Sequence, residues 1–270
     1  MFKFLLLISL TGSALASPFV QSIAKQEIIL HGKNAYQVRC AGCHGDKGDG
    51  KGPAAAFLNP APRDFTSGIF KFRSSGIGTL PNDHDLMQTL SKGVSGTSMP
   101  SFADVPEQER FAIVQYVKTF SKSWEDPANY GPVVQGTPFP EEDFRDYKKF
   151  IARAERGRKL FIESCVLCHG NNGVGDGEGA TDLTDDWNQP IRPANLTNLT
   201  IKAGKSVNDI YKTLLVGVNG TPMSSYKDVY TDDQLWDLSA WVLYLRGLHH
   251  DVYDLNNPPL SLIQPHEVQN

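Results

Sequence analysis

Cys40-Ala41-Gly42-Cys43-His44 and Cys165-Val166-Leu167-Cys168-His169 are two copies of one pentapeptide, C-x-x-C-H, and they contain all four cysteines of this 270-residue chain. In this motif the two thiols can form thioether bonds to the vinyl groups of haem, while the adjoining histidine binds the iron. No cysteine is left over for a disulfide. The sequence therefore predicts two covalently attached c-type haems, each with its iron, as the cofactors.

Two other readings of paired cysteines fit the sequence less well. A thioredoxin-type redox pair would be expected within a βαβ pattern, which this chain lacks. A four-cysteine zinc site would require two pairs 125 residues apart to converge. Neither reading explains why a histidine directly follows both pairs.

The N-terminus has the pattern of a secretory signal peptide. Lys3 precedes an apolar run from Phe4 to Leu10, and Ala14-Leu15-Ala16 supplies a small-residue cleavage signature before Ser17. We therefore expect residues 1–16 to be removed and the mature chain to be periplasmic. No later stretch is apolar enough to predict a membrane span in the mature chain.

The charge of the chain bears on its partners. Its formal net charge is −4 at pH 7, which argues against a broad basic surface for nucleic acid. A local patch for docking a protein redox donor or acceptor remains compatible with this value.

An internal repeat surrounds the two motifs. Gly32 and Tyr36 precede Cys40 at the same offsets at which Gly157 and Phe161 precede Cys165. Further downstream, Gly96-Thr97-Ser98-Met99 matches Gly220-Thr221-Pro222-Met223, with the offset remaining at 124 or 125 residues. The repeat predicts two tandem domains of one fold. The expected organisation is a signal peptide (1–16), a first domain (17–125), a Pro-rich linker (126–145), a second domain (146–250) and a C-terminal tail (251–270).

Apolar periodicity predicts an all-α fold, with three principal helices in each domain. The expected helical ranges are 24–40, 83–93 and 107–121 in the first domain and 150–165, 207–217 and 231–246 in the second. Gly32 and Gly157 are expected where the first helix crosses closely over the last, beside Tyr116 and Trp241. The alternation Phe70-Lys71-Phe72 predicts a short strand or hairpin edge.

These features resemble the class I cytochrome c domain, duplicated as in diheme c-type cytochromes. The resemblance covers roughly residues 25–250 and rests on the two attachment motifs, the downstream methionines and the glycine–aromatic pairs. It implies two helical domains, each folded around one covalent haem. The segments Arg63-Asp64-Phe65 and Phe70-Lys71-Phe72-Arg73 are similar to those of diheme cytochromes that serve as electron-transfer partners or subunits of larger oxidoreductases.

The sixth ligand of each iron distinguishes electron transfer from catalysis. We expect His44 and Met99 to bind one iron, and His169 and Met223 the other, because both methionines lie in equivalent glycine-containing loops. Packing in the core is the usual role of methionine and remains the alternative; it is our prediction for Met87, on the middle helix. The other histidines are minor rival ligands: His31, His84, His249, His250 and His266.

Groups around the predicted ligands are harder to assign. An axial histidine needs an acceptor for its second ring N–H, and the carbonyl of Pro53 lies at the spacing seen in class I cytochromes. Glu178 occupies the corresponding position in the second domain. Guanidinium groups suit haem propionates, and the candidates are Arg63, Arg73 and Arg192. Trp187 could pack on a haem edge or in the core.

The leading hypothesis from sequence is a diheme electron-transfer protein without enzymatic activity. It would pass single electrons between a protein donor and a protein acceptor, as a soluble carrier or as a subunit of a membrane-associated respiratory complex. The alternative is a diheme enzyme of the peroxidase or thiosulfate-oxidising type. A peroxidase needs a haem iron with an open sixth position. Thiosulfate-oxidising relatives use a cysteine as a ligand of the catalytic haem, and this chain has no cysteine outside its two motifs.

Overall fold

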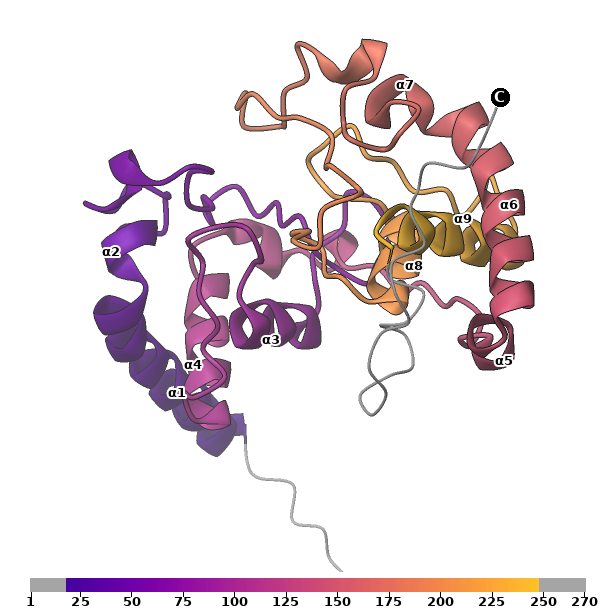
Figure 1. Ribbon diagram of the computed structural model, residues 1–270. Coiled ribbons are helices and arrows are strands. Elements are labelled where there is room, and N and C mark those ends of the chain that lie inside the picture. Colours follow the sequence, from indigo (N-terminus) through magenta and orange to yellow (C-terminus); the bar gives the residue numbers. More distant parts are fainter. Residues whose placement is uncertain (1–17, 248–270) are drawn as a thin grey trace, which may run out of the picture.

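Residues 18–247 are described by the structure, a computed structural model, and form two helical halves in sequence order (Figure 1). The first half contains α1 (Pro18–Arg39), α2 (Ala41–His44), η1 (Ala55–Phe57), α3 (Asp83–Lys92) and α4 (Glu107–Lys118). The second half contains α6 (Tyr147–Ser164), α7 (Val166–His169), η4 (Glu178–Ala180), α8 (Val207–Val216) and α9 (Asp232–Leu245). The predicted signal peptide, the whole predicted tail and three rival histidines (His249, His250 and His266) lie outside the described residues.

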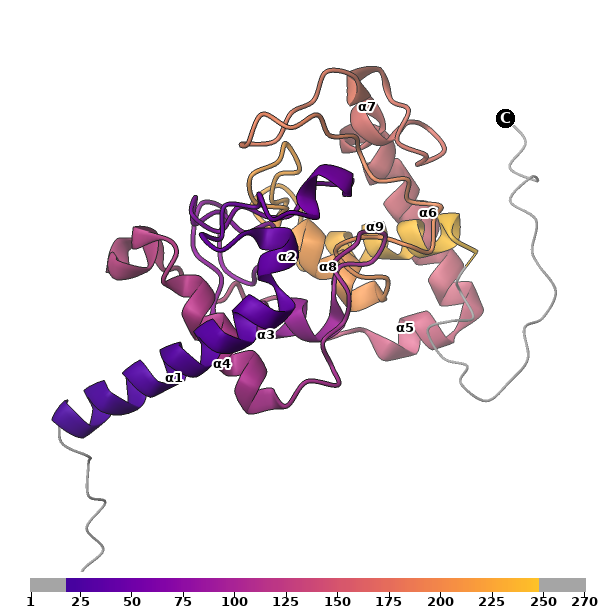
Figure 2. The ribbon, with the colours of Figure 1, turned by 90° about the vertical axis from the view of Figure 1, so that its left-hand side faces the viewer.

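The long first helix of each half crosses the last helix at a glycine. A Cβ added at Gly32 of α1 would lie only 1.9 Å from the carbonyl oxygen of Ala112 on α4. In the second half a Cβ at Gly157 of α6 would lie 2.0 Å from the carbonyl oxygen of Asp237 on α9. The predicted close crossing is confirmed, and Figure 2 shows α1 running beside α4.

The middle helices begin and end at matched capping residues. The Asn82 side chain accepts a hydrogen bond from the backbone N–H of Asp85 in a capping box at the start of α3, and Ser206 caps α8 in the same way. Both helices end at a glycine with positive φ, 67° at Gly93 and 70° at Gly217. These local signals explain why the predicted bounds differ from the observed ones by only one residue.

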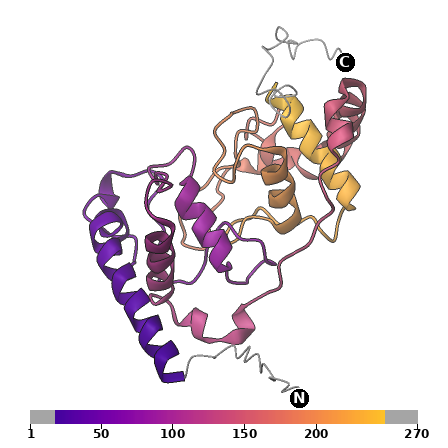
Figure 3. The ribbon, with the colours of Figure 1, turned by 90° about the horizontal axis from the view of Figure 1, so that it is seen from below.

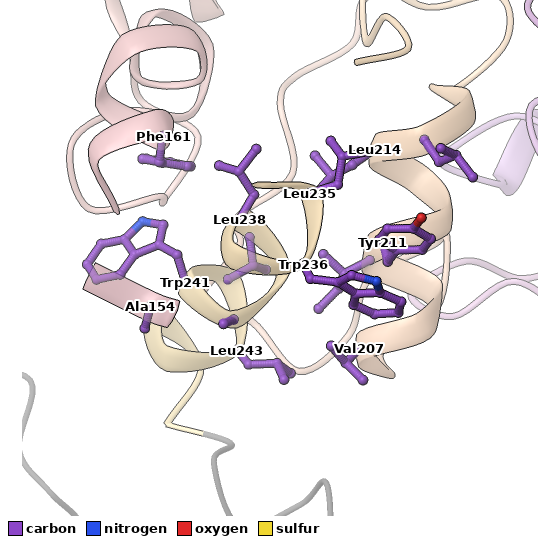
Figure 4. Packing of buried hydrophobic residues seen from close by; sticks show 14 of the residues in the cluster. Ala154, Phe161, Val207, Tyr211, Leu214, Leu235, Trp236, Leu238, Trp241 and Leu243 are labelled. Atoms are coloured by element: carbon purple, nitrogen blue, oxygen red, sulfur yellow. The ribbon is translucent and has the colours of Figure 1, made fainter. Parts of the chain in front are cut away.

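Each half has its own hydrophobic core. In the second half α9 is covered by α6 on one side and α8 on the other (Figure 4). Tyr211 of α8 stacks on Trp236 of α9 with ring centroids 3.8 Å apart. The first core is smaller and includes Tyr36, Phe70 and Ile113. Two cores of this kind are the packing expected for two domains.

The predicted strand at Phe70-Lys71-Phe72 is wrong: the described residues contain only isolated β-bridges. Phe70 is buried in the first core, whereas Lys71 forms an ion pair with Asp185 of the second half at 3.1 Å. The alternation therefore arises because Phe70 faces the core of the first half while Lys71 faces the second half. It does not reflect hydrogen bonding in a sheet.

The segment between the halves follows the surface of the first and then reaches the second (Figure 3). It contains η2 (Lys122–Glu125), η3 (Pro127–Asn129) and α5 (Glu141–Arg145). Tyr130 and Val133 form β-bridges to Leu80 and Ser75 of the first half. None of the helices in residues 18–247 is long and apolar enough to cross a membrane.

Candidate haem sites

Each C-x-x-C-H motif forms a short helical turn at the end of a long helix. The backbone N–H of His44 donates to the Cys40 carbonyl at 2.9 Å, and that of His169 donates to the Cys165 carbonyl at 2.8 Å. No disulfide joins any of the four cysteines, and Cys40 and Cys165 are each 8 % exposed. The turn keeps both sulfur atoms and the imidazole of one motif on the same short segment, as attachment to a single haem requires.

The electrostatics of these cysteines differ from those of a redox pair. Burial raises the pKa of Cys40 to about 11 and that of Cys165 to about 12. Reactive pairs of the thioredoxin type instead have a thiol with a depressed pKa. Within residues 18–247 no group of three or more His, Cys, Asp or Glu side chains could hold a metal ion. The two cysteine pairs therefore do not converge on a zinc site.

Both motif histidines hydrogen-bond to a backbone carbonyl. Nδ1 of His44 lies 3.0 Å from the carbonyl oxygen of Arg63, and Nδ1 of His169 lies 3.0 Å from that of Ala194. Because a carbonyl oxygen only accepts, each Nδ1 must carry the proton. The lone pair then resides on Nε2, the nitrogen available to bind iron. Burial also lowers the pKa of both histidines, which favours the neutral ring.

The prediction that Pro53 supplies this carbonyl is wrong. The acceptor comes from later in the loop, in two matching stretches, Pro62-Arg63-Asp64-Phe65-Thr66 and Pro193-Ala194-Asn195-Leu196-Thr197. The side chain of Asp64 accepts a hydrogen bond from the backbone N–H of Thr66, as Asn195 does from Thr197. The shared pattern was visible in the sequence, but its offset of 131 residues departs from the offset of 125 that relates the motifs. Glu178 therefore gives no reason to expect weaker support for His169.

The loops that contain the predicted methionine ligands also match. We call residues 93–99 the Met99 loop and residues 217–223 the Met223 loop. In the first, the Thr97 hydroxyl donates to the Val94 carbonyl at 2.8 Å and accepts from the Met99 backbone N–H at 3.1 Å. The corresponding distances for Thr221 in the second loop are 2.7 and 3.2 Å.

Each methionine is part-buried beside the core of its own half. Met99 packs against the core that contains Tyr36, and Met223 against the core that contains Phe161. Met87 also packs against the first core, as expected for a methionine on the middle helix. Coordination of iron by Met99 and Met223 remains a prediction that the matched loop geometry supports.

Several buried N–H groups lack a partner among the described residues. They are Nη1 of Arg73, Nε1 of Trp124 and Nε1 of Trp241, together with Nε of Arg110. Unpaired buried donors are unfavourable unless a ligand satisfies them. A haem has two propionate carboxylates that can accept from donors of this kind, and the cysteine and imidazole groups of each motif fit the same cofactor.

The three arginines proposed for the propionates have different surroundings. Arg73 is 2 % exposed and donates to the carbonyls of Gly76 and Val216, which leaves Nη1 available. The guanidinium of Arg63 instead lies over the ring of Trp187, and Arg192 is exposed. Arg73 is therefore the best candidate of the three.

Comparisons with known proteins identify the same two units. The family model for cytochrome c matches residues 29–121 and again residues 154–246. A chain of the reducing HAO-like protein complex Kustc0457/Kustc0458 of Kuenenia stuttgartiensis is 36% identical, with a TM-score of 0.72, over 80% of this chain and 95% of that one.

Curated relatives include two subunits of cbb3-type cytochrome c oxidases. FixP of Bradyrhizobium diazoefficiens is 29% identical over 64% of this chain and 52% of its own length. FixPc of Rhizobium leguminosarum bv. viciae is 28% identical over 61% of this chain and 47% of its own length. The chain thus spans about half the length of the curated relatives it matches. It belongs to the cytochrome c family, with two tandem domains and hence two covalently bound c-type haems.

Proposed function

We propose that this protein transfers single electrons between protein redox partners and that a methionine is the sixth ligand of each haem iron. The matched geometry of the Met99 and Met223 loops is the observation that carries the proposal. Two loops with the same hydrogen bonds, in domains with the same attachment motif, are expected to perform the same task twice. When bound, each haem supplies one iron that accepts and releases one electron.

The residues of each domain have separate tasks in this proposal. Cys40 and Cys43 tether the first haem, and Cys165 and Cys168 the second. His44 and His169 each present Nε2, with the tautomer fixed by the carbonyl that accepts from Nδ1. Met99 and Met223 present a thioether, which raises the reduction potential relative to a second nitrogen ligand. With a histidine and a methionine bound, neither iron would keep an open position for a substrate.

Each motif histidine also has an aromatic neighbour. The ring of Phe65 stacks on His44 with centroids 4.5 Å apart, and Phe161 lies 6.4 Å from His169. His44 is 9 % exposed, so close packing restricts the movement of its imidazole, whereas His169 is only partly buried. A donor set that stays in place as the charge changes keeps reorganisation small during electron transfer.

The partners we propose are proteins of a respiratory oxidoreductase complex. The curated relatives are named as oxidase subunits, and the similar structure comes from a multi-protein complex. By analogy this chain would serve as an electron-transfer subunit or as a carrier that docks to such a complex. Attachment of c-type haem outside the cytoplasm and the signal-like residues 1–16 support a periplasmic location.

Reductive titration of the purified protein tests this proposal. We expect an intact mass with two haem additions and reversible uptake of two electrons per chain. Met99→Ala and Met223→Ala should each lower the potential of one haem and remove its sulfur-to-iron charge-transfer absorbance. Met87→Ala is the matched control and should leave both signals in place. Retention of both signals in Met99→Ala or Met223→Ala would disprove the ligand assignment.

A further inference from the structure

Trp187 lies in a part of the second domain that the first domain lacks. The two iron-binding histidines are 125 residues apart, whereas their carbonyl partners, Arg63 and Ala194, are 131 residues apart. The second domain therefore has six more residues between the histidine and its partner. Since the first site is assembled without this insertion, the insertion is not required to bind a haem.

The side chain of Trp187 is held by the first domain. Cζ of Arg63 lies 3.6 Å from the Trp187 ring centroid, a face-on cation–π contact. The indole Nε1 donates to the hydroxyl of Ser67 at 3.3 Å. Nζ of Lys71 lies 5.6 Å from the ring and pairs with Asp185, two residues before Trp187, at 3.1 Å. The ring is thus fixed from three positions of one first-domain segment.

The opposite edge of Trp187 lies against the Met223 loop. A Cβ added at Gly220 would be 2.8 Å from Cη2 and Cζ3 of the ring, so only glycine permits this approach. The backbone N–H of Asp186 donates to the Gly220 carbonyl at 3.1 Å. Asn219 also contacts the first domain, since its backbone N–H donates to the Lys71 carbonyl at 3.2 Å.

Arg63 connects these contacts to the other haem site. Its carbonyl oxygen accepts from Nδ1 of His44, while its guanidinium stacks on Trp187. One residue thus orients the histidine of the first domain and touches the ring that supports the methionine loop of the second. Three contacts in series connect His44 to the loop that carries Met223: His44 to Arg63, Arg63 to Trp187, and Trp187 to Gly220.

We propose that Trp187 is a positioning residue that couples the two haem sites: clamped between Arg63 and Gly220, it holds the Met223 loop in the conformation that ligation requires. This inference rests on the proposed role of Met223 as an iron ligand. It predicts that a change in the first domain, at Arg63, alters ligation in the second. A role in general domain packing makes no such prediction.

A second contact between the domains provides the control. Nζ of Lys212 lies 3.4 Å from Oδ1 of Asp85, and this pair joins α8 to α3. Neither residue contacts Trp187 or the Met223 loop in the hydrogen bonds and ion pairs of the structure. Lys212→Gln therefore weakens the contact between domains without removing the clamp.

The experiment follows each ligand separately in the complete, haem-loaded protein. The ring-current-shifted methyl resonances of the two ligating methionines in the ferrous protein are assigned with Met99→Ala and Met223→Ala. They are then recorded against denaturant concentration for Trp187→Leu, Trp187→Phe, Arg63→Gln and Lys212→Gln, together with both midpoint potentials.

Trp187→Leu and Arg63→Gln should each raise the population with Met223 detached about tenfold, the size expected for loss of a partly buried cation–π contact. Trp187→Phe keeps a flat ring and should restore most of the ligation. In Lys212→Gln the Met223 resonance should disappear at the same denaturant concentration as the Met99 resonance. The inference would be overturned if the Met223 resonance and the potential of the second haem in Trp187→Leu and Arg63→Gln matched those of wild type. It would also be overturned if they matched those of Lys212→Gln.

The wild-type protein separates this inference from the proposed function. Uptake of two electrons with both methionine resonances present supports the proposed function whatever the Trp187 variants do. Absence of the Met223 resonance in wild type would contradict the ligand assignment and, with it, the coupling. If Trp187→Leu fails to assemble, Arg63→Gln gives the decisive comparison, because it leaves the indole in place.

Discussion

At the scale of single residues, a threonine hydroxyl holds the backbone of each predicted methionine ligand in place. In the Met223 loop the Thr221 hydroxyl donates to the Val218 carbonyl and accepts from the Met223 backbone N–H. The Val218 N–H in turn donates to the Met223 carbonyl at 2.9 Å. The loop is therefore closed by its own hydrogen bonds on both sides of the methionine, and the same pattern holds Met99.

Replacing Thr221 by valine should loosen this loop. The substitution removes two hydrogen bonds while keeping the side-chain volume, which corresponds to about 1–2 kcal/mol. We expect the charge-transfer absorbance of the second haem to disappear at a lower denaturant concentration. Thr213→Val is the matched control, because that hydroxyl bonds to the Asp209 carbonyl within α8 at 2.8 Å. Equal sensitivity of the two variants would show that the hydroxyl of Thr221 has no special role.

At the scale of elements, the position of each haem motif depends on the crossing of two helices. The motif of the first domain follows α1 directly, so the angle and depth at which α1 meets α4 determine where Cys40 and His44 lie. Tyr36, fully buried on α1, donates from its hydroxyl to the Gly45 carbonyl just after the motif at 2.7 Å. Packing of the helix and placement of the motif are thereby linked.

Gly32→Ala should disrupt this crossing. The added methyl would lie 1.9 Å from the Ala112 carbonyl oxygen, so the helices must separate. Overpacking of this kind costs about 1–3 kcal/mol, more than the gain of up to ~1 kcal/mol in helix propensity. Thermal unfolding checks this, with Gly76→Ala as the control because nothing lies within 4 Å of its added Cβ. A Gly32→Ala protein as stable as Gly76→Ala would contradict the close crossing.

The sequence predicted those features that local signals determine. Helix ends at Asn82 and Gly93 follow from capping chemistry, and the crossing glycines recur with an aromatic residue four positions later. The acceptor for His44 was assigned incorrectly because the folding back of a loop, rather than its spacing from the motif, determines which carbonyl reaches Nδ1. The role of Trp187 required knowledge of how the two domains meet, which periodicity within one domain does not contain.

At the scale of the whole molecule, one segment of the first domain makes most of the polar contacts with the second. Arg63, Lys71, Arg73 and Gly78 interact with Trp187, Asp185, Val216 and Asn219 respectively. The guanidinium of Arg73 is buried between the domains, and its Nη2 donates to the Val216 carbonyl at 2.9 Å. A buried contact of this kind differs from exposed ion pairs, which contribute little to stability. The two haem sites therefore belong to one packed unit.

Asp185 should make this interface sensitive to acid. Burial disfavours its charged form, but hydrogen bonds from the Gln189 backbone N–H and from Lys71 outweigh this effect and hold the pKa of Asp185 below its usual value. A carboxyl group whose pKa is lower in the folded state stabilises the fold above its unfolded pKa, about 3.9. That contribution is lost as the pH falls through the folded pKa.

Asp185→Asn should therefore be less stable than wild type at pH 7, and this difference should shrink as the pH falls below about 4. Denaturant midpoints at a series of pH values measure it. The exposed neighbour Asp186 provides the control, since Asp186→Asn should change stability little at any of these pH values. A difference between wild type and Asp185→Asn that stays constant down to pH 3 would exclude an ionised Asp185 as its source.

The most direct test of the account is the spin state and ligation of both irons in the oxidised protein, read together by electron paramagnetic resonance and near-infrared absorption. We predict two low-spin ferric haems, each with a sulfur-to-iron charge-transfer band, in a chain whose mass shows two haem additions. A high-spin ferric signal from either haem, or a near-infrared band of two nitrogen ligands, would contradict the claim that Met99 and Met223 close both sites.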